Sequence, residues 1–443
     1  MSDLAFGGVL IGALVLLVLL GAHIAIALIA VAFAGIWLMR QDVEMAMRLF
    51  YMASYNGVAD YIFATIPLFV LMGLLVSVGN VGKDTFEVAE ALLRRVRGGL
   101  GVATVAANTV FAAVTGVSIA SAAVFTRVAV PEMVRHGYRT TFATGTVAGS
   151  SVLGMMIPPS LLMIIYGVLA EQSIGKLFIA GVIPGFLLAL AFAVMIVLMA
   201  TFTPAKVFDL QKLEALRQTQ DTLPRMGVAV MAGKLVPIVL LVALVLGGLY
   251  SGFFTPTEAG GIGAFGALLI AGARRRLGTG NLWKVLHETG SVSVGILVLL
   301  VAASFYSRML SVAGVPVAIA ELVRDAGLGP YGFLLLYVGI VLFLGMILDS
   351  SSILLIMTPI AAPIAAQMGF DLIHFGVITV LAVEIGLLTP PFGISIFTVK
   401  ATLNDPKVSV ESIFAGAMPF VGVMLLVLLL VALLPVLSLA LVR

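Results

Sequence analysis

Two stretches of this chain carry the same small, polar and proline residues in the same order. The first, residues 116–160, contains GVSIASAAVFTRVAVPEMVRHGY and then GSSVLGMMIPPS. The second begins 232 residues later with LDSSSILLIMTPIAAPIAAQMGF and continues to VEIGLLTPPFG. The positions that coincide without a gap are Ser118 with Ser350, Pro131 with Pro363, Gly137 with Gly369, Gly154 with Gly386, and Pro158-Pro159 with Pro390-Pro391. A match that keeps both Pro-Pro pairs in register indicates a duplicated functional element.

The first Pro-Pro pair interrupts an apolar segment and predicts free backbone oxygens there. Proline has no N–H to donate and moves the preceding residue out of the α region. We therefore expect the carbonyls around Gly154 and Met155 to lose their helical partners. With the hydroxyls of Ser150 and Ser151, they would form a set of oxygen ligands suited to Na⁺, as at the unwound helices of transporters.

The second copy supplies the same parts. It has backbone carbonyls at 384–386, the Thr389 hydroxyl before a second Pro-Pro pair, and Asp349 followed by three serines. Half-helices that start in mid-membrane would also present positive dipole ends to an anionic substrate. A single copy could be a kink in a packed helix, since Pro and Gly are common in membrane helices. Two copies in register favour a functional site.

Asp349 and Glu384 are acidic residues deep in apolar sequence. Charges within a membrane are costly unless they are functional or paired. Asp349 could also cap the helix that follows it, and the two roles are compatible. The sequence contains no HExxH, GxGxxG, Walker or nucleophile-elbow motif, so it gives no support to an enzyme with catalytic residues or an organic cofactor.

The composition is that of an all-α polytopic membrane protein. Of 443 residues, 62% are hydrophobic and 10% are charged, against about 25% charged in soluble domains. Apolar runs recur that are long enough to cross a hydrocarbon layer of about 30 Å. The bilayer is therefore an obligatory partner. The net charge of +3 gives no reason to expect nucleic acid, and the absence of Cys excludes disulfides.

The chain divides into two repeats, residues 1–202 and 234–443, joined by a polar linker at 203–233. Each repeat is expected to run as two helices, an interfacial arm, a span, an amphipathic arm, a second span, a re-entrant helical hairpin, a broken helix and a long final helix. The hairpins are expected at about 116–136 and 349–368, and the broken helices at about 142–169 and 373–398.

Transporter halves of this kind are often inverted, with the binding site between them at mid-membrane. Inversion requires an odd number of membrane crossings in each half, whereas the order above gives six. Either one of the expected breaks is wrong, with the break at Gly21–His23 the first candidate, or the two halves are not inverted.

Several motifs in combination resemble a known family. They are PLFVLMG, GVSIASAA with VPEMVRHGY, GMMIPPS, FTPTEAGGIGA and TPPFG. Together they resemble the large membrane (M) subunit of tripartite ATP-independent periplasmic (TRAP) transporters over nearly the whole chain. The resemblance implies an elevator-type secondary transporter of the bacterial inner membrane, driven by a Na⁺ gradient. It implies organic acid substrates, such as C4-dicarboxylates, sialic acid and related carboxylates or sugar acids.

The resemblance also implies site residues, carried over by motif. One Na⁺ site would use Gly116, Ser118, Ser150, Gly154 and Pro158. The other would use Asp349, Ser350, Ser351, Gly386, Thr389 and Pro390. The substrate would lie between the hairpin tips, near Ser118, Ser121, Ser351 and Ser352. The hairpins and broken helices would form the moving transport domain, and the first two helices of each half the scaffold.

Two partners are implied: a soluble periplasmic substrate-binding protein and a small four-helix membrane subunit. The small subunit is expected to be a separate chain, because no four-helix extension precedes Met1. The nearest rival function is a stand-alone Na⁺/organic anion symporter of the same elevator type. A channel or a membrane enzyme acting on lipid-linked acids is a more distant alternative.

Overall fold

The computed structural model describes residues 3–218, 226–391 and 393–442. Within these ranges all named secondary-structure elements are helices. One isolated β-bridge pairs Tyr138 with Phe208. In this part of the chain 6 helices are long and apolar enough to cross a membrane, or up to 8 if each bent helix pair is one span. The prediction of an all-α polytopic membrane protein is confirmed.

The described part of the first half contains eleven α-helices and one 3₁₀ helix. They are α1 (Asp3–Leu19), α2 (Ile24–Arg40), α3 (Val43–Ala59), η1 (Tyr61–Ala64), α4 (Thr65–Val78), α5 (Val81–Leu93), α6 (Gly99–Thr115), α7 (Ser118–Arg135), α8 (Thr140–Ser151) with α9 (Leu153–Met156), α10 (Leu161–Leu169) and α11 (Ile174–Phe202). The break at Gly21–His23 is present, because α1 ends before it and Gly21 has a left-handed φ of 87°. That break is therefore not the error in the crossing count.

The second half follows two short linker helices. The elements are α12 (Pro204–Val207), α13 (Leu210–Gln218), α14 (Val228–Tyr250), α15 (Pro256–Ala273), α16 (Thr279–Val312), α17 (Val315–Asp325), α18 (Pro330–Gly345), α19 (Ser350–Gln367), α20 (Leu372–Gly386), α21 (Ile394–Leu403), α22 (Val410–Leu433) and α23 (Val436–Leu439). The linker ends earlier than residue 233, since α14 already begins at Val228. The expected final helix is shorter, because α22 ends just before Pro435 and only the short α23 follows.

The interfacial arm and the span expected after the first two helices of the second repeat are one continuous helix, α16, of 34 residues. In the first half the equivalent elements, α3 and α4, are separate. Asp60 caps η1 there, with its carboxylate accepting from the Ile62 amide at 3.0 Å. A capped start of this kind ends one helix and begins the next, which accounts for the difference between the halves.

The first hairpin is built from two whole helices, α6 and α7, that meet at Gly116 and Val117. The Leu100 amide near the start of α6 donates to Tyr138 Oη, just beyond the end of α7, at 3.3 Å. The two helices are therefore antiparallel, and the hairpin enters and leaves on one side. The expected helix–break–helix within 116–136 is wrong: α7 is continuous through Pro131, and the turn lies at Gly116, which has a left-handed φ of 64°.

The second hairpin consists of α18 and α19 in the same manner. Phe333 near the start of α18 and Phe370 just after α19 both stack near Phe375, with ring centroids 6.3 and 6.2 Å from it. Both ends of this hairpin therefore also lie on one side. If α6 and α18 are counted as hairpin arms and not as spans, the order expected from the sequence has five crossings in each half in place of six, the odd number that inversion requires.

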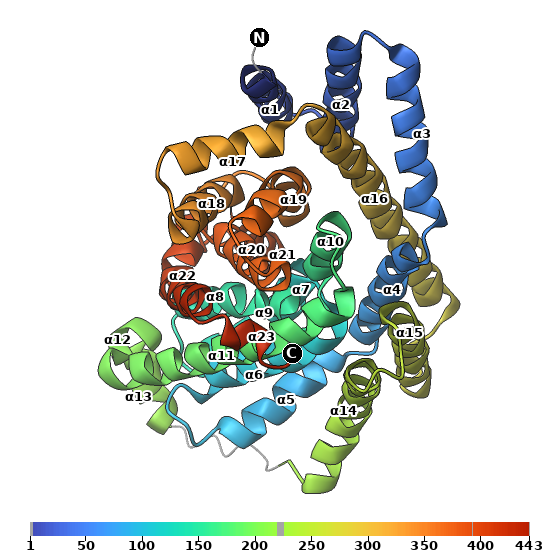
Figure 1. The fold of residues 1–443 in the computed structure, drawn as a ribbon. Helices are drawn as coiled ribbons and strands as arrows, with labels where there is room; N and C mark the ends of the chain where they lie inside the picture. Colours follow the sequence, from blue (N-terminus) through green and yellow to red (C-terminus); the bar gives the residue numbers. More distant parts are fainter. Residues whose placement is uncertain (1–2, 219–225, 392, 443) are drawn as a thin grey trace.

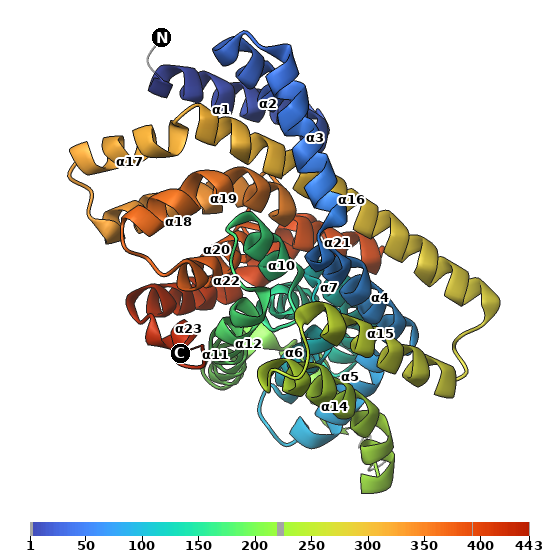
Figure 2. The same cartoon turned by 45° about the vertical axis from the view of Figure 1, so that its right-hand side comes forward.

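The two halves pack reciprocally. Helix α4 of the first half packs along α15 and α2 along α16, while α8 packs along α22 and α11 along α20. Exchanging equivalent elements of the two repeats (α4 with α16, α2 with α15, α8 with α20, α11 with α22) turns the first contact of each set into the second, as a twofold relation between the halves requires. In both views α1–α4 and α14–α16 form an outer arc, and α6–α11 with α18–α22 form an inner cluster (Figures 1 and 2).

Candidate functional site

The tip of the first hairpin lies directly against the break in the first broken helix. The Gly116 carbonyl accepts a hydrogen bond from the Leu161 amide at 3.2 Å. A Cβ added at Gly116 would lie 2.5 Å from the Pro159 carbonyl oxygen, and one added at Gly154 would lie 3.0 Å from the Val117 carbonyl and 3.1 Å from the Ser118 amide. At Gly116, where φ is also left-handed, only glycine allows this approach, and at Gly154 a larger residue would require the backbone of Val117 and Ser118 to shift by a few tenths of an ångström. The structure therefore brings Gly116, Ser118 and Gly154 together with the Pro-Pro pair, which is buried.

A buried chain of hydrogen bonds joins both helices of the first hairpin, α6 and α7, to α8. Asn108 of α6 donates through Nδ2 to Ser150 Oγ at 2.6 Å, and its Oδ1 accepts from the Ser121 hydroxyl. Ser150 in turn donates to the Thr146 carbonyl at 2.7 Å. The sequence reading missed Asn108, although an amide within a helix of small, apolar residues is the signal that marks an interhelical hydrogen bond in membranes. Ser121 and Ser150 are thus both parts of this chain.

Part of the expected oxygen set is already bonded within the protein. Ser160 Oγ donates to the Met155 carbonyl, and Ser151 Oγ donates to the Ala148 carbonyl at 2.7 Å. The expectation that the Met155 carbonyl is free is therefore wrong, because the serine after the Pro-Pro pair replaces the lost helical donor. The two segments on either side of the break, Thr140–Met156 and Leu161–Leu169, are bent by 43°.

Ser118 at the first hairpin tip is hydrogen-bonded to the second half of the chain. Its Oγ donates to Glu384 Oε2, near the end of α20, at 2.7 Å. Each of the two residues is only 1% exposed. The second carboxylate oxygen, Oε1, has no hydrogen-bond partner among the described residues. The sequence identified Glu384 as a buried charge but gave no means of pairing it with a residue 266 positions away.

At the second hairpin tip Asp349 caps α19. Its carboxylate accepts from the Ser351 amide at 3.0 Å and the Ser352 amide at 3.2 Å, and also from the Ser352 hydroxyl. This confirms the capping role. Asp349 is exposed and Ser351 is half-buried, whereas Ser350 and Ser352 are buried. The second tip is thus more open than the first.

The break in the second broken helix contacts the other arm of its hairpin. A Cβ added at Gly386 would lie 2.6 Å from Gly345 Cα, at the end of α18. Thr389 Oγ1 donates to the Ile385 carbonyl at 2.8 Å, and Pro390 is exposed. Both Pro-Pro peptide bonds are cis. The residues expected to form the second Na⁺ site come from two places in the fold. Asp349, Ser350 and Ser351 lie at the start of α19, and Gly386, Thr389 and Pro390 lie at or just after the end of α20.

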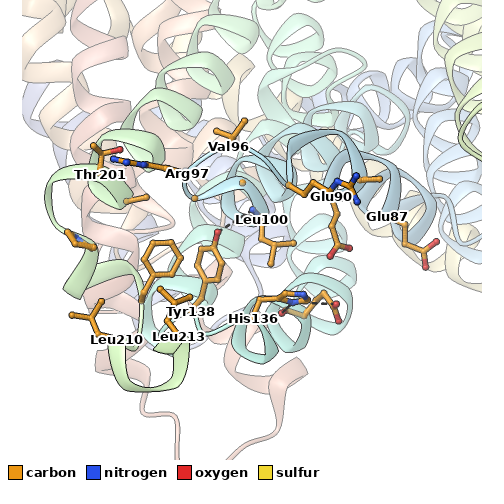
Figure 3. A pocket seen from close by; sticks show the side chains of 18 of the residues that line it. Glu87, Glu90, Val96, Arg97, Leu100, His136, Tyr138, Thr201, Leu210 and Leu213 are labelled. Carbon is orange, nitrogen blue, oxygen red and sulfur yellow. Dashed lines mark hydrogen bonds and ion pairs between the residues drawn. The ribbon is translucent and has the colours of Figure 1, made fainter. Parts of the chain in front are cut away.

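A large cavity of about 1550 Å³ lies at the opposite end of the first hairpin, between α5, the end of α7 and the linker helices. Glu90 points there toward His136 (Figure 3), and one ligand atom from each of Glu90, Glu132 and His136 lies within 4.8 Å of the others. These residue types can bind a divalent cation. Glu132 is also paired with Arg135 at 2.6 Å, which already offsets part of the negative charge.

Two residues beside the cavity, both outside the membrane spans, have raised pKa values because they are partly buried. Burial, and then the neighbouring carboxylate of Glu132, raise the pKa of Glu90. Burial raises the pKa of Tyr138 to about 12, so that its hydroxyl remains protonated beside the Leu100 amide. The cavity contains none of the residues that the sequence assigned to Na⁺ or substrate.

The paired hairpins and broken helices define an all-helical membrane transport protein made of two repeats. The fold matches the structure titled "Crystal structure of the Alcanivorax borkumensis YdaH transporter reveals an unusual topology", with a TM-score of 0.58 over 90% of this chain and 88% of that one. At 14% sequence identity, this likeness shows a shared fold.

Sequence comparison identifies the family. Residues 11–437 match the family described as "Tripartite ATP-independent periplasmic transporter, DctM component". The chain belongs to this family, whose members are permease subunits and not enzymes, and the resemblance inferred from its motifs is confirmed.

Curated relatives support the assignment. The C4-dicarboxylate TRAP transporter large permease protein DctM of Pseudomonas aeruginosa is 35% identical over 402 residues, 90% of this chain and 89% of that protein. The 2,3-diketo-L-gulonate TRAP transporter large permease protein YiaN of Escherichia coli is 30% identical over 96% of this chain and 95% of that protein. The sialic acid TRAP transporter permease protein SiaT of Haemophilus influenzae is 30% identical, and the match covers 84% of this chain and 58% of that longer protein.

Proposed function

We propose that this chain is the large permease subunit of a transporter that couples uptake of an organic acid to entry of Na⁺ across a bacterial inner membrane. The observation that carries the proposal is the seating of the first hairpin tip, Gly116 to Ser118, against the Pro158-Pro159 break, with the Glu384 carboxylate beside it. Backbone carbonyls, a hydroxyl and a carboxylate meet there in a buried position. Such oxygen ligands suit Na⁺.

The proposed Na⁺ ligands at this tip are the oxygens of Gly116, Ser118, Ser150, Gly154 and Pro158. The second proposed set is Asp349, Ser350, Ser351, Gly386, Thr389 and Pro390, and it requires the start of α19 and the end of α20 to act together. Asp349 and Pro390 are exposed while the first break is buried, which supports the proposal that ions reach the second set more readily in this conformation.

The proposed substrate is an organic anion bound between the tips near Ser118, Ser121, Ser351 and Ser352. The relatives are named for C4-dicarboxylate, sialic acid, 2,3-diketo-L-gulonate and isethionate, all acids with a carboxylate or sulfonate. Helices α7 and α19 begin at Ser118 and Ser350. Their positive dipole ends favour an anion at the tips.

The proposed motion is of the elevator type. The outer arc of α1–α4 and α14–α16 would remain fixed as the scaffold, and the inner cluster with both hairpins would carry the ions and substrate (Figure 2). The amphipathic helices α5 and α17 join the two parts along the chain. They are the elements that would hinge as the cluster moves.

Two partners complete the proposed transporter: a periplasmic protein that delivers the anion, and a small four-helix membrane subunit. One relative, the isethionate TRAP transporter permease protein DctMQ, is longer than this chain, which covers 65% of it. Its name and its greater length fit a protein in which the large and small membrane subunits are fused. The open second tip is a surface to which a delivered anion has access.

The test is uptake into proteoliposomes that contain this chain with the small membrane protein encoded beside it. Candidate acids are supplied with the purified binding protein, with an inward Na⁺ gradient or with choline in its place. Uptake that requires both Na⁺ and the binding protein supports the proposal. Uptake with Na⁺ alone would favour a stand-alone symporter of the same elevator type, and anion leak without any gradient would contradict coupling.

A further inference from the structure

We propose that Glu384, contributed by the second half, provides the carboxylate of the Na⁺ site at the first hairpin tip. This inference rests on the Na⁺ coupling proposed above and adds to the first site a residue from the second copy that has no acidic counterpart in the first copy. It makes the first site a joint product of both repeats, because Ser118 lies in α7 and Glu384 in α20.

The environment of Glu384 calls for a cation. The residue is 1% exposed, and its carboxylate receives one hydrogen bond, from Ser118, among the described residues. A buried charge without a partner is strongly unfavourable, whereas one beside a bound cation is compensated. The basic residue of α21, Lys400, is engaged elsewhere, because it donates to the carbonyls of Asp405 at 2.7 Å and Val408 at 2.5 Å. The free oxygen, Oε1, is therefore available as a ligand.

The hydrogen bond also orients Ser118. A hydroxyl has one proton and two lone pairs, and Ser118 gives its proton to Glu384 Oε2 across 2.7 Å. The lone pairs of Ser118 then point away from the carboxylate and remain free for a cation. Glu384 thus acts on the site in two ways: it provides negative charge and it fixes the ligand orientation of the tip serine.

Comparison of the two repeats shows that neither Glu384 nor Asp349 has an acidic counterpart in the first copy. At the fixed offset of 232 residues, Glu384 corresponds to Val152, and Asp349 corresponds to Val117. The second tip therefore has its own acid, whereas the first tip has valine at that place and receives an acid from the opposite half. Each tip ends up with one carboxylate, the charge that compensates one Na⁺.

The test measures the Na⁺ dependence of uptake by the full transporter in proteoliposomes. Glutamine keeps the size of Glu384 and a hydrogen-bond acceptor for Ser118 but removes the charge. We expect Glu384→Gln to raise the Na⁺ concentration for half-maximal uptake by about tenfold or more, because hydrogen bonds and contacts to charged groups are the strong ones. Glu384→Asp, which keeps the charge, should recover part of the affinity. Glu321→Gln, at an exposed acid on α17, is the matched control and should leave it unchanged.

A binding measurement separates loss of the site from loss of the fold. The complex of this chain with the small subunit is heated in Na⁺ and in choline. Wild-type protein should melt at a higher temperature in Na⁺, because a ligand that binds the folded state stabilises it. Glu384→Gln should lose this Na⁺ effect while melting in choline at or above the wild-type temperature, since a buried charge has been removed.

The outcomes divide the two proposals. If the wild type shows neither Na⁺-dependent uptake nor Na⁺-dependent stabilisation, Na⁺ coupling itself is wrong. If the wild type shows both and Glu384→Gln keeps the wild-type Na⁺ dependence, coupling stands and the role of Glu384 is overturned. A double-mutant cycle with Ser118→Ala adds a second criterion: effects on Na⁺ affinity that simply add would contradict an action of Glu384 through Ser118.

Discussion

The Gly116 carbonyl accepts a hydrogen bond from the Leu161 amide at 3.2 Å, so the turn of the first hairpin is fastened to the helix that restarts after the Pro-Pro break. Leu161 is the first residue of α10, where amides have no partner within their own helix. The hairpin tip thus satisfies a donor that the break exposes. This contact makes the tip and the broken helix one unit.

Gly116→Ala should disrupt this unit. The residue has a left-handed φ of 64°, and an added Cβ would lie 2.5 Å from the Pro159 carbonyl oxygen. A non-glycine residue in such a conformation costs about 1 kcal/mol or more, and the close contact adds to it. We expect a lower melting temperature and loss of Na⁺-dependent uptake. Gly247→Ala, where an added Cβ meets nothing within 4 Å, is the control, and equal effects of the two changes would contradict this account.

Asn108→Ala should loosen the first hairpin from α8. The change removes the link between Ser121 and Ser150 and leaves the buried Ser121 hydroxyl without its acceptor. Unsatisfied buried polar groups cost about 1–3 kcal/mol. Thermal unfolding in detergent would measure this, with Thr109→Ala next to it as the control, because the Thr109 hydroxyl donates to the Val105 carbonyl of its own helix. If the Asn108→Ala/Ser121→Ala double variant regains stability, the hydrogen bond between Asn108 and Ser121 is confirmed as the cause of the loss. If the losses of stability from the two changes simply add, this explanation is contradicted.

The sequence predicted the elements of this fold well because apolar length and Pro-Pro pairs are local signals. It placed the break at Gly21–His23 where the structure has it. It placed the first hairpin too late, because α6 is long and apolar enough to read as a span. What marks α6 as a hairpin arm is the contact between Leu100 and Tyr138, which no local pattern shows.

The candidate site was predictable within each repeat and not between them. The shared offset grouped Ser118 and Gly154, the family resemblance added Gly116, and the structure brings these residues together at one tip. The pairing of Ser118 with Glu384 joins different repeats, so a comparison of the two copies cannot find it. The second set of expected ligands remains a prediction, since its two groups lie on α19 and α20.

An ion-pair network fastens the arm α5 to the scaffold helices of the opposite half. Arg274 at the end of α15 donates to Asp84 and, at 2.8 Å, to the Gly79 carbonyl, while Lys234 of α14 pairs with Glu87. The side chains of Arg274 and Asp84 are only 21% and 18% exposed. An arm that hinges during transport must move relative to these residues or carry them along.

Asp84→Asn should therefore leave Arg274 partly buried without its counter-charge. We expect a loss of stability of about 1–3 kcal/mol, below that of a fully buried pair, and a change in maximal uptake rate with little change in substrate affinity. Arg274→Gln in the same chain should restore stability, because both charges are then absent. A double variant no more stable than Asp84→Asn alone would argue against the network. Lys284→Gln, at an exposed pair with Glu288, is the control.

Glu90 at the cavity should make stability depend on pH. Burial is the main cause that raises its pKa above the ordinary value of 4.5; Glu132 and Glu87 add to it, and His136 and Arg135 oppose it. A carboxyl whose pKa is raised by folding favours the folded state fully below pH 4.5 and loses this contribution as pH rises through the folded pKa. Glu90→Gln does not ionise, so its melting temperature relative to wild type should rise from pH 4.5 to pH 8. Glu214→Gln, at an exposed acid lining the same cavity, is the control. If the difference in melting temperature between Glu90→Gln and wild type stays constant with pH, or grows toward acid, then ionisation of Glu90 does not destabilise the folded state and the prediction is wrong.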